Sequence, residues 1–99
     1  MEAKTKAGWV YLMANLRTRQ TYLGVTGDLP KRIWQHRNGV TESYSKEKGC
    51  AALVWFEAYD DLHEARRREL QMKKWKRDWK IELIERDNPQ WNDLYETLL

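Results

Sequence analysis

Glu69 is the residue of this sequence whose position is hardest to explain by packing alone. Leu62, Ala65 and Met72 are separated by three and seven residues, which places them on the packing face of one predicted helix. Glu69 follows Ala65 by four residues and precedes Met72 by three, so we expect its carboxylate on the same inward face. A carboxylate there needs a cation, hydrogen-bond donors or a metal ion to offset its burial. The spacing therefore predicts either a site that uses this charge or a structural ion pair with an arginine from elsewhere.

Two tyrosines and a glycine are predicted to share one side of a hairpin. Tyr11 lies in the apolar segment 8–14 and Tyr22 in the segment 21–26, and pairing the two most apolar faces leaves both rings on the same side. Gly24 stands beside them inside its strand, where glycine often marks the close approach of another group. The two phenols can belong to a site, or they can fill a core with their hydroxyls hydrogen-bonded.

Arg32 and His36 are four residues apart and hence adjacent on one face of a predicted helix. His36 follows Leu29 by seven residues, so it borders the apolar stripe predicted for Leu29, Ile33 and Val40. Such a pair can act on an anion, or it can be a surface cluster of cations.

A strongly basic segment surrounds Glu69. Eight lysines and arginines fall within residues 66–80, and only Glu69 and Asp78 oppose them. Trp75 and Trp79 are interleaved with these cations. Such a segment suits contacts to nucleic-acid phosphates, which are blind to base sequence, whereas the alternative is a solvated helix face with its tryptophans in the core. The residues that we expect to contact nucleic acid are Lys31, Arg66, Arg67, Lys73, Lys74, Lys76 and Arg77.

The first half of the chain predicts a hairpin followed by a helix. Gly8–Ala14 and Thr21–Thr26 are strand-like, and the short loop between them favours an antiparallel connection. Asp28 predicts the N-cap of a helix that has Pro30 in its first turn and ends near Arg37.

The second half predicts a strand and further helices. After a polar loop over 40–49, Ala52–Tyr59 predicts a third, largely buried strand. A long helix is predicted from Asp61 to about Trp79, and residues 80–85 fit either a helix or a short strand. Asn88 and Pro89 predict the start of a short C-terminal helix. Its apolar face would consist of Trp91, Leu94, Tyr95 and Leu98.

The element order β-β-α-β-α plus a C-terminal helix predicts an α+β fold, a small three-stranded antiparallel sheet flanked by helices. We expect a single domain over 8–99 after an N-terminal tail over 1–7. The one cysteine, Cys50, excludes an internal disulfide and a cysteine-rich zinc site. No apolar run suggests a membrane span or a signal peptide, so we expect a cytoplasmic protein with no membrane partner.

Together these residues resemble the GIY-YIG nuclease superfamily, in particular its small stand-alone bacterial members. Trp9-Val10-Tyr11 matches the first signature element and keeps its tyrosine, while Tyr22-Leu23-Gly24 matches the second about ten residues later. The helix arginine of the family falls on Arg32 and a histidine one turn on falls on His36. The metal-binding glutamate falls on Glu69. The resemblance spans nearly the whole chain, with five positions in the same order.

The resemblance implies an endonuclease that hydrolyses phosphodiester bonds of nucleic acid, with DNA favoured, and that depends on Mg²⁺ or Mn²⁺. Glu69 would hold the metal ion, which water and the substrate phosphate complete, and Arg32 would stabilise the phosphoryl oxygens. Tyr11 would activate the attacking water, with Tyr22 orienting it. A free phenol has a pKa near ~10, so nearby cations must favour the phenolate if Tyr11 acts as a base. His36 could relay a proton or contact phosphate.

The sequence departs from the family at one position and leaves other functions open. Well-studied members carry an asparagine twelve to fifteen residues beyond the glutamate, where this chain has Ile81–Ile84, and the nearest asparagine is Asn88. A nucleic-acid-binding module with weak or no catalysis is the main alternative. An unrelated interaction domain would leave the inward Glu69 unexplained. Substrate specificity would come from nucleic-acid shape or from a protein partner.

Overall fold

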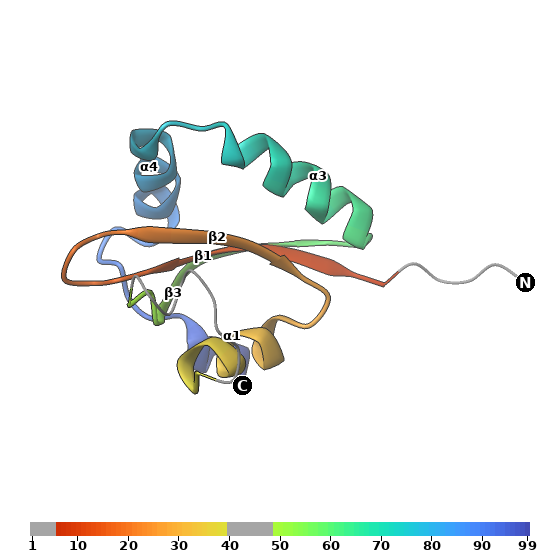
Figure 1. Ribbon diagram of the computed structural model, residues 1–99, viewed down its shortest axis with the longest axis horizontal. Helices are drawn as coiled ribbons and strands as arrows, with labels where there is room; N and C mark the ends of the chain where they lie inside the picture. The colour runs from red at the N-terminus through yellow and green to blue at the C-terminus, as the bar shows by residue number, and fades with distance from the viewer. Residues whose placement is uncertain (1–5, 40–48) are drawn as a thin grey trace, which may run out of the picture.

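Three antiparallel strands form the centre of the molecule in the computed structural model, which describes residues 6–39 and 49–99. β1 (Gly8–Ala14) and β2 (Thr21–Thr26) make the predicted hairpin, and β3 (Ala52–Tyr59) pairs with the other side of β1. The strand order is therefore β2-β1-β3, with β1 in the middle (Figure 1). All three strands have the bounds that the sequence predicts, and the α+β fold is confirmed.

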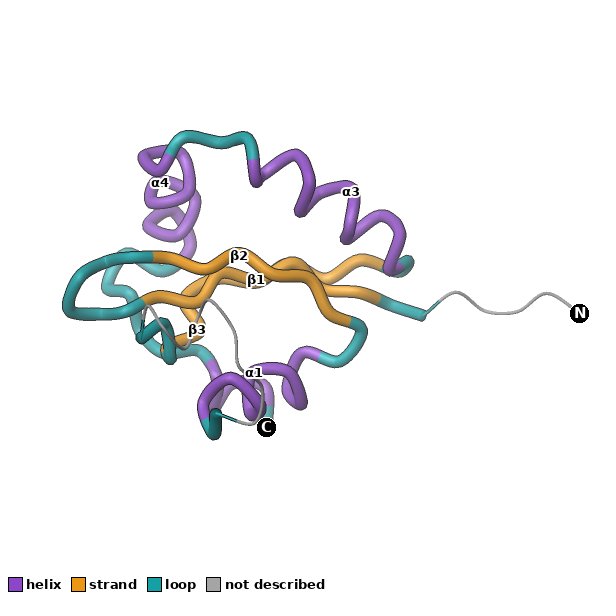
Figure 2. Tube along the Cα trace, viewed as in Figure 1, coloured by secondary structure: helices purple, strands orange, loops and turns teal. Residues whose placement is uncertain are grey.

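Helices cover both faces of this sheet (Figures 1 and 2). α1 (Leu29–Arg37) lies on one face, capped as predicted by the Asp28 side chain. α3 (Leu62–Lys73) and α4 (Arg77–Asp87) lie on the other face. Residues 80–85, which the sequence left between helix and strand, are helical.

The prediction of one long helix over 61–79 is wrong, because the chain breaks the helix at 74–76. A continuous helix over Leu62–Asp87 would be about 39 Å long at 1.5 Å per residue. The eight-residue strand β3 spans only about 27 Å. A straight helix would therefore overrun the sheet, whereas the break lets α4 bury Leu83 and Ile84 against the same core.

The prediction of a C-terminal helix from Asn88 is also largely wrong, since only a 3-10 turn, η1 (Tyr95–Leu98), forms there. The Leu94 N–H donates to the Leu53 carbonyl at 2.7 Å, and the Leu53 N–H donates to the Asp93 carboxylate at 3.2 Å. Polar groups of this segment thus form hydrogen bonds with strand β3 instead of within a helix.

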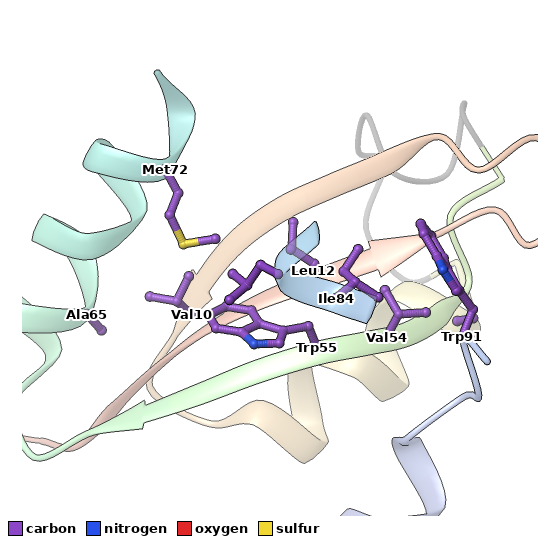
Figure 3. Packing of buried hydrophobic residues seen from close by; sticks show 11 residues of the cluster. Val10, Leu12, Val54, Trp55, Ala65, Met72, Ile84 and Trp91 are labelled. Carbon is purple, nitrogen blue, oxygen red and sulfur yellow. The ribbon is translucent and has the colours of Figure 1, made fainter. Parts of the chain in front are cut away.

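Each face of the sheet carries its own hydrophobic core. On the α3 side, Val10 and Leu12 pack with Met72, Ile84 and Trp91 (Figure 3). The core on the α1 side consists of Tyr11, Met13, Leu29, Ile33, Cys50 and Leu53. The alternation predicted for β1 is therefore confirmed, and it places Tyr11 on the face opposite the α3 core.

Some predicted features lie outside the described residues: Val40, the loop over 40–48 and residues 1–5 of the N-terminal tail. Within the two described stretches, no helix combines the length and the apolar character that crossing a bilayer requires.

Candidate active site

A groove of about 470 Å³ runs along strand β2, which is an edge of the sheet. Its lining residues come from β1, β2, α1, α3 and α4. Figure 1 shows α1 on one side of the sheet and α3 and α4 on the other. It brings together four predicted site residues: Tyr11, Tyr22, Arg32 and Glu69. His36 is not a lining residue, but it is hydrogen-bonded to Tyr11. The lining residues are Tyr11, Thr21, Tyr22, Leu23, Gly24, Val25, Arg32, Glu69, Lys73 and Lys80.

Gly24 makes room for the Tyr11 ring to reach the groove. Tyr11 stands opposite Gly24 in the strand register and Met13 stands opposite Tyr22, so both tyrosines are on one face, as predicted. Their ring centroids are 6.4 Å apart. A Cβ atom on Gly24 would lie 2.4 Å from both Cζ and the hydroxyl oxygen of Tyr11. The phenol therefore crosses the edge strand at the place where a side chain is missing.

Tyr11 and His36 form a buried hydrogen bond, with 2.9 Å between the phenol oxygen and Nε2. Burial lowers the pKa of His36 to about 4, and the charge of Arg32 adds to this effect. Neutral His36 can accept the phenol hydrogen at Nε2 when its own hydrogen is on Nδ1.

The condition under which Tyr11 could act as a phenolate, that nearby cations favour its ionised form, is not met. Burial raises the pKa of Tyr11 to about 12, and the opposing influence of Arg32 is smaller. Tyr11 is therefore a neutral phenol at neutral pH, and it can donate a hydrogen bond to His36.

Glu69 lies on the inward face of α3, with only 8% of its surface exposed, as its spacing predicts. Its partner is not an arginine from elsewhere but Lys73, one turn along the same helix, with 3.6 Å between Nζ and Oε2. The groove thus contains one carboxylate and three cations: Arg32, Lys73 and Lys80. Lys80 was not singled out from the sequence, because its placement depends on where α4 begins after the helix break.

The donor set suits a metal ion that needs few protein ligands. Glu69 contributes one carboxylate to the groove, and in the described parts of the chain no three His, Cys, Asp or Glu side chains gather to hold a metal ion. Mg²⁺ fits such a site, because it keeps several waters and is completed by substrate phosphate oxygens. A zinc site would need three or more protein ligands.

The seven residues expected to contact nucleic acid are all exposed, but only Lys73 lines the groove. Arg77 instead donates to the Arg19 carbonyl at 3.1 Å, which ties α4 to the β1–β2 turn. Trp75 is half-buried against the core, whereas Trp79 is 52% exposed. The two indole rings pack edge-on, with 6.2 Å between their centroids. The tryptophans are thus divided between core and surface.

Asn88 is committed to the architecture of the C-terminal segment. It is buried, and its amide nitrogen donates to the Val54 carbonyl at 3.0 Å and to the Asn92 carbonyl at 2.9 Å. Its amide oxygen accepts from the Asn92 N–H at 3.0 Å. Asn88 is not among the groove residues, so it does not replace the asparagine that the nuclease resemblance led us to seek.

Comparison with known proteins agrees with this architecture. Residues 7–82 match the GIY-YIG catalytic domain. A UPF0213 protein of Clostridium perfringens is 37% identical over 76 residues, covering 77% of this chain and 81% of that protein. A UPF0213 protein of Vibrio parahaemolyticus is 34% identical over 86 residues, covering 86% of this chain and 80% of that protein. The solution NMR structure of a UPF0213 protein from Bacillus halodurans matches with a TM-score of 0.56 and 26% identity, over 88% of this chain and 92% of that one. This chain therefore belongs to the GIY-YIG catalytic domain family, which implies a nuclease acting on nucleic acid.

Proposed function

We propose that this chain is a metal-dependent endonuclease that hydrolyses phosphodiester bonds in DNA. The observation that carries the proposal is the convergence of a phenol, a guanidinium and a buried carboxylate on one groove, from Tyr11, Arg32 and Glu69. A surface that only binds phosphates has no use for a buried carboxylate among its cations.

Tyr11 and His36 would move the proton of the attacking water. The phenol oxygen takes a proton from water while its own hydrogen passes to Nε2 of His36, which is 2.9 Å away. No free phenolate is needed, which matters because burial holds the pKa of Tyr11 at about 12. A phosphate beside Arg32 would offset the positive charge that helps to depress the pKa of His36, so bound substrate would make His36 a better base.

Arg32 and Tyr22 would hold the reacting groups in place. The guanidinium of Arg32 presents paired N–H donors to the phosphoryl oxygens as negative charge builds on them. The Tyr22 ring packs edge-on against His36, with 5.4 Å between centroids, and so helps to fix the imidazole beside Tyr11. Tyr22 also lines the groove, where its hydroxyl could orient the water.

Glu69 would be the protein ligand of a Mg²⁺ or Mn²⁺ ion. When bound, such an ion polarises the phosphoryl oxygens and stabilises the charge of the leaving oxygen. Without the ion, Lys73 neutralises the negative charge of the Glu69 carboxylate. The Lys73 side chain is 58% exposed, so it can turn from Glu69 toward a phosphate when the ion binds.

A nicking assay on supercoiled DNA with a Mg²⁺ titration tests the proposal. We expect cleavage by the wild type that chelation of the metal abolishes. We expect losses of roughly 10²-fold or more in Arg32→Ala and Glu69→Ala, on the scale of removing one charge-stabilising group. Circular dichroism should show both variants folded. If they cut as fast as the wild type, the cleavage belongs to a contaminant or to another site.

A nucleic-acid-binding module is the second candidate, favoured by the Lys73–Glu69 ion pair. An internal cation satisfies this carboxylate without any metal ion. This reading predicts that the wild type binds DNA but cuts none of several duplex, branched and single-stranded substrates, with either Mg²⁺ or Mn²⁺. RNA versions of the same substrates test the preference for DNA.

A further inference from the structure

Lys80 differs from the other lysines of the basic segment. It is half-buried and its side chain lines the groove, whereas Lys74 and Lys76 are exposed and lie outside it. Among residues 6–39 and 49–99, no carboxylate forms an ion pair with Lys80, because the groove carboxylate of Glu69 is paired with Lys73. Within the described parts of the chain, Lys80 is therefore a partly desolvated cation without an acidic partner.

The groove as a whole has a net positive charge. Arg32, Lys73 and Lys80 contribute three cations, and Glu69 contributes the one carboxylate. Removing an ammonium group from water is unfavourable unless an anion compensates for it. A nucleic-acid strand supplies one negative charge per nucleotide, so its phosphates are the anions that match an elongated groove of this kind.

The position of Lys80 along the groove follows from the start of α4. Arg77 begins α4 and donates to the carbonyl of Arg19 in the β1–β2 turn at 3.1 Å. α4 lies over the end of the sheet that is next to the β1–β2 turn (Figure 1), and Lys80 follows Arg77 by about one helical turn. We therefore assign Lys80 to the end of the groove where Thr21 begins strand β2.

Tyr11 lies farther along the same edge, because it stands opposite Gly24. Gly24 and Thr21 are separated by about 10 Å along an extended strand. Phosphates of one DNA strand are spaced by about 3.4 Å along the duplex axis. We propose that Lys80 forms a second phosphate subsite, which holds a phosphate within about three nucleotides of the bond that is cut. This inference rests on the proposed nuclease function, and it assigns to that groove the recognition of a neighbouring linkage on the same strand.

Neutral linkages in the substrate test the subsite. A duplex oligonucleotide is prepared with one methylphosphonate at each position around the cleaved bond, and KM and kcat are measured separately. For the wild type, one neighbouring position should raise KM by roughly three- to tenfold, as expected for one partly exposed charged contact. Lys80→Gln should raise KM by a similar factor on the unmodified duplex, leave kcat unchanged and become insensitive to that position. Lys80→Arg should retain the wild-type pattern.

Arg86→Gln is the matched control, since it removes one positive charge from the same helix. Arg86 lies in the last turn of α4, is largely exposed and is 3.5 Å from the Asp87 carboxylate. The control should keep the wild-type KM and the wild-type sensitivity to the neutral linkage. The proposal is overturned if Lys80→Gln keeps that sensitivity, or if both variants change KM alike.

A binding experiment tests the Lys80 subsite separately from cleavage. If the wild type cuts no DNA, the proposed nuclease function is refuted, but the binding experiment still shows whether Lys80 contacts a phosphate. Affinity for a fluorescein-labelled DNA duplex is measured without added metal over a range of salt concentrations. Lys80→Gln should reduce the slope of log Kd against log salt by about one, the change expected for one lost phosphate contact. An unchanged slope, or an equal change in Arg86→Gln, overturns the subsite.

Discussion

Burial fixes the protonation states of the two side chains that would carry the proton. Tyr11 and His36 are both neutral at neutral pH, since burial raises the pKa of the phenol to about 12 and lowers that of the imidazole to about 4. Their 2.9 Å hydrogen bond joins the groove to the core behind it. In the proposed mechanism, this neutral pair would take the proton of the attacking water.

Tyr11→Phe removes the hydroxyl and keeps the ring. Cleavage under single-turnover conditions should fall by roughly 10²- to 10⁴-fold, the usual contribution of a proton-transferring group. Affinity for DNA should be unchanged, and stability should fall by about 1 kcal/mol for one lost hydrogen bond. A Tyr11→Phe protein that cuts within a few-fold of the wild type would remove the phenol from the mechanism.

His36 should also make stability depend on pH. Its pKa is about 4 in the folded protein against 6.5 for the free side chain, so the unfolded chain binds more protons between these values. The stability that neutral His36 contributes is complete above pH 6.5 and is lost as the pH falls toward 4. Urea unfolding should therefore show that the wild type loses stability relative to His36→Gln as the pH falls from 6.5 to 4. A constant difference would mean that His36 does not titrate abnormally.

At the scale of elements, strand β2 positions the site because its Gly24 carries no side chain. Gly24→Ala would place a Cβ atom 2.4 Å from the Tyr11 phenol. We expect a destabilisation of about 1–3 kcal/mol, typical of overpacking, with a large loss of cleavage as Tyr11 is displaced. Gly27→Ala is the control, because its Cβ would come no closer than 3.8 Å to the Ala7 carbonyl oxygen. Equal urea midpoints for the two variants would contradict the close approach.

The C-terminal segment should be needed for stability and not for chemistry. Asn88→Ala removes a buried amide with three hydrogen bonds to Val54 and Asn92. We expect a loss of about 1–3 kcal/mol of stability, because buried backbone groups lose their partners. Cleavage per folded molecule should be unchanged at a temperature well below the unfolding transition. A selective loss of cleavage would show that Asn88 contributes to the chemistry and not only to stability.

The sequence predicts those elements whose signals are local. Alternation in the strands and the cap at Asp28 set the bounds of β1, β2, β3 and α1, and the i+4 relation of Glu69 to Ala65 predicts its inward position. The break at 74–76 could not be predicted, because no glycine or proline marks it and the contacts that α4 makes through Leu83 and Ile84 are with residues distant in sequence. The placement of Lys80 in the groove depends on that break, and the pKa of Tyr11 depends on burial by elements distant in sequence.

At the scale of the whole molecule, the groove exists because layers on opposite faces of the sheet meet at one edge. The C-terminal segment bonds to β3, and β2 remains as the edge that faces the groove. The formal charge of +3 is concentrated by the basic segment on the α3 and α4 side of that edge. The shape therefore presents an edge strand and two cationic walls to an extended polyanion.

This charge distribution predicts binding to DNA that weakens steeply with salt. Each phosphate neutralised by a lysine or arginine adds about 0.9 to the slope of log affinity against log salt on duplex DNA. We expect a slope that corresponds to several contacts, measured by fluorescence anisotropy without added metal. A flat response would remove the basic segment from the interface.

The buried carboxylate of Glu69 separates a nuclease from a binding module, so cleavage and binding measured on one preparation of Glu69→Gln test the account most directly. Glu64→Gln is the matched control, an exposed carboxylate in the first turn of the same helix. We predict that Glu69→Gln binds DNA at least as tightly as the wild type but loses Mg²⁺-dependent cleavage by roughly 10²-fold or more, while Glu64→Gln cuts normally. If Glu69→Gln cuts DNA at the rate of the wild type, the groove on β2 is not the active site.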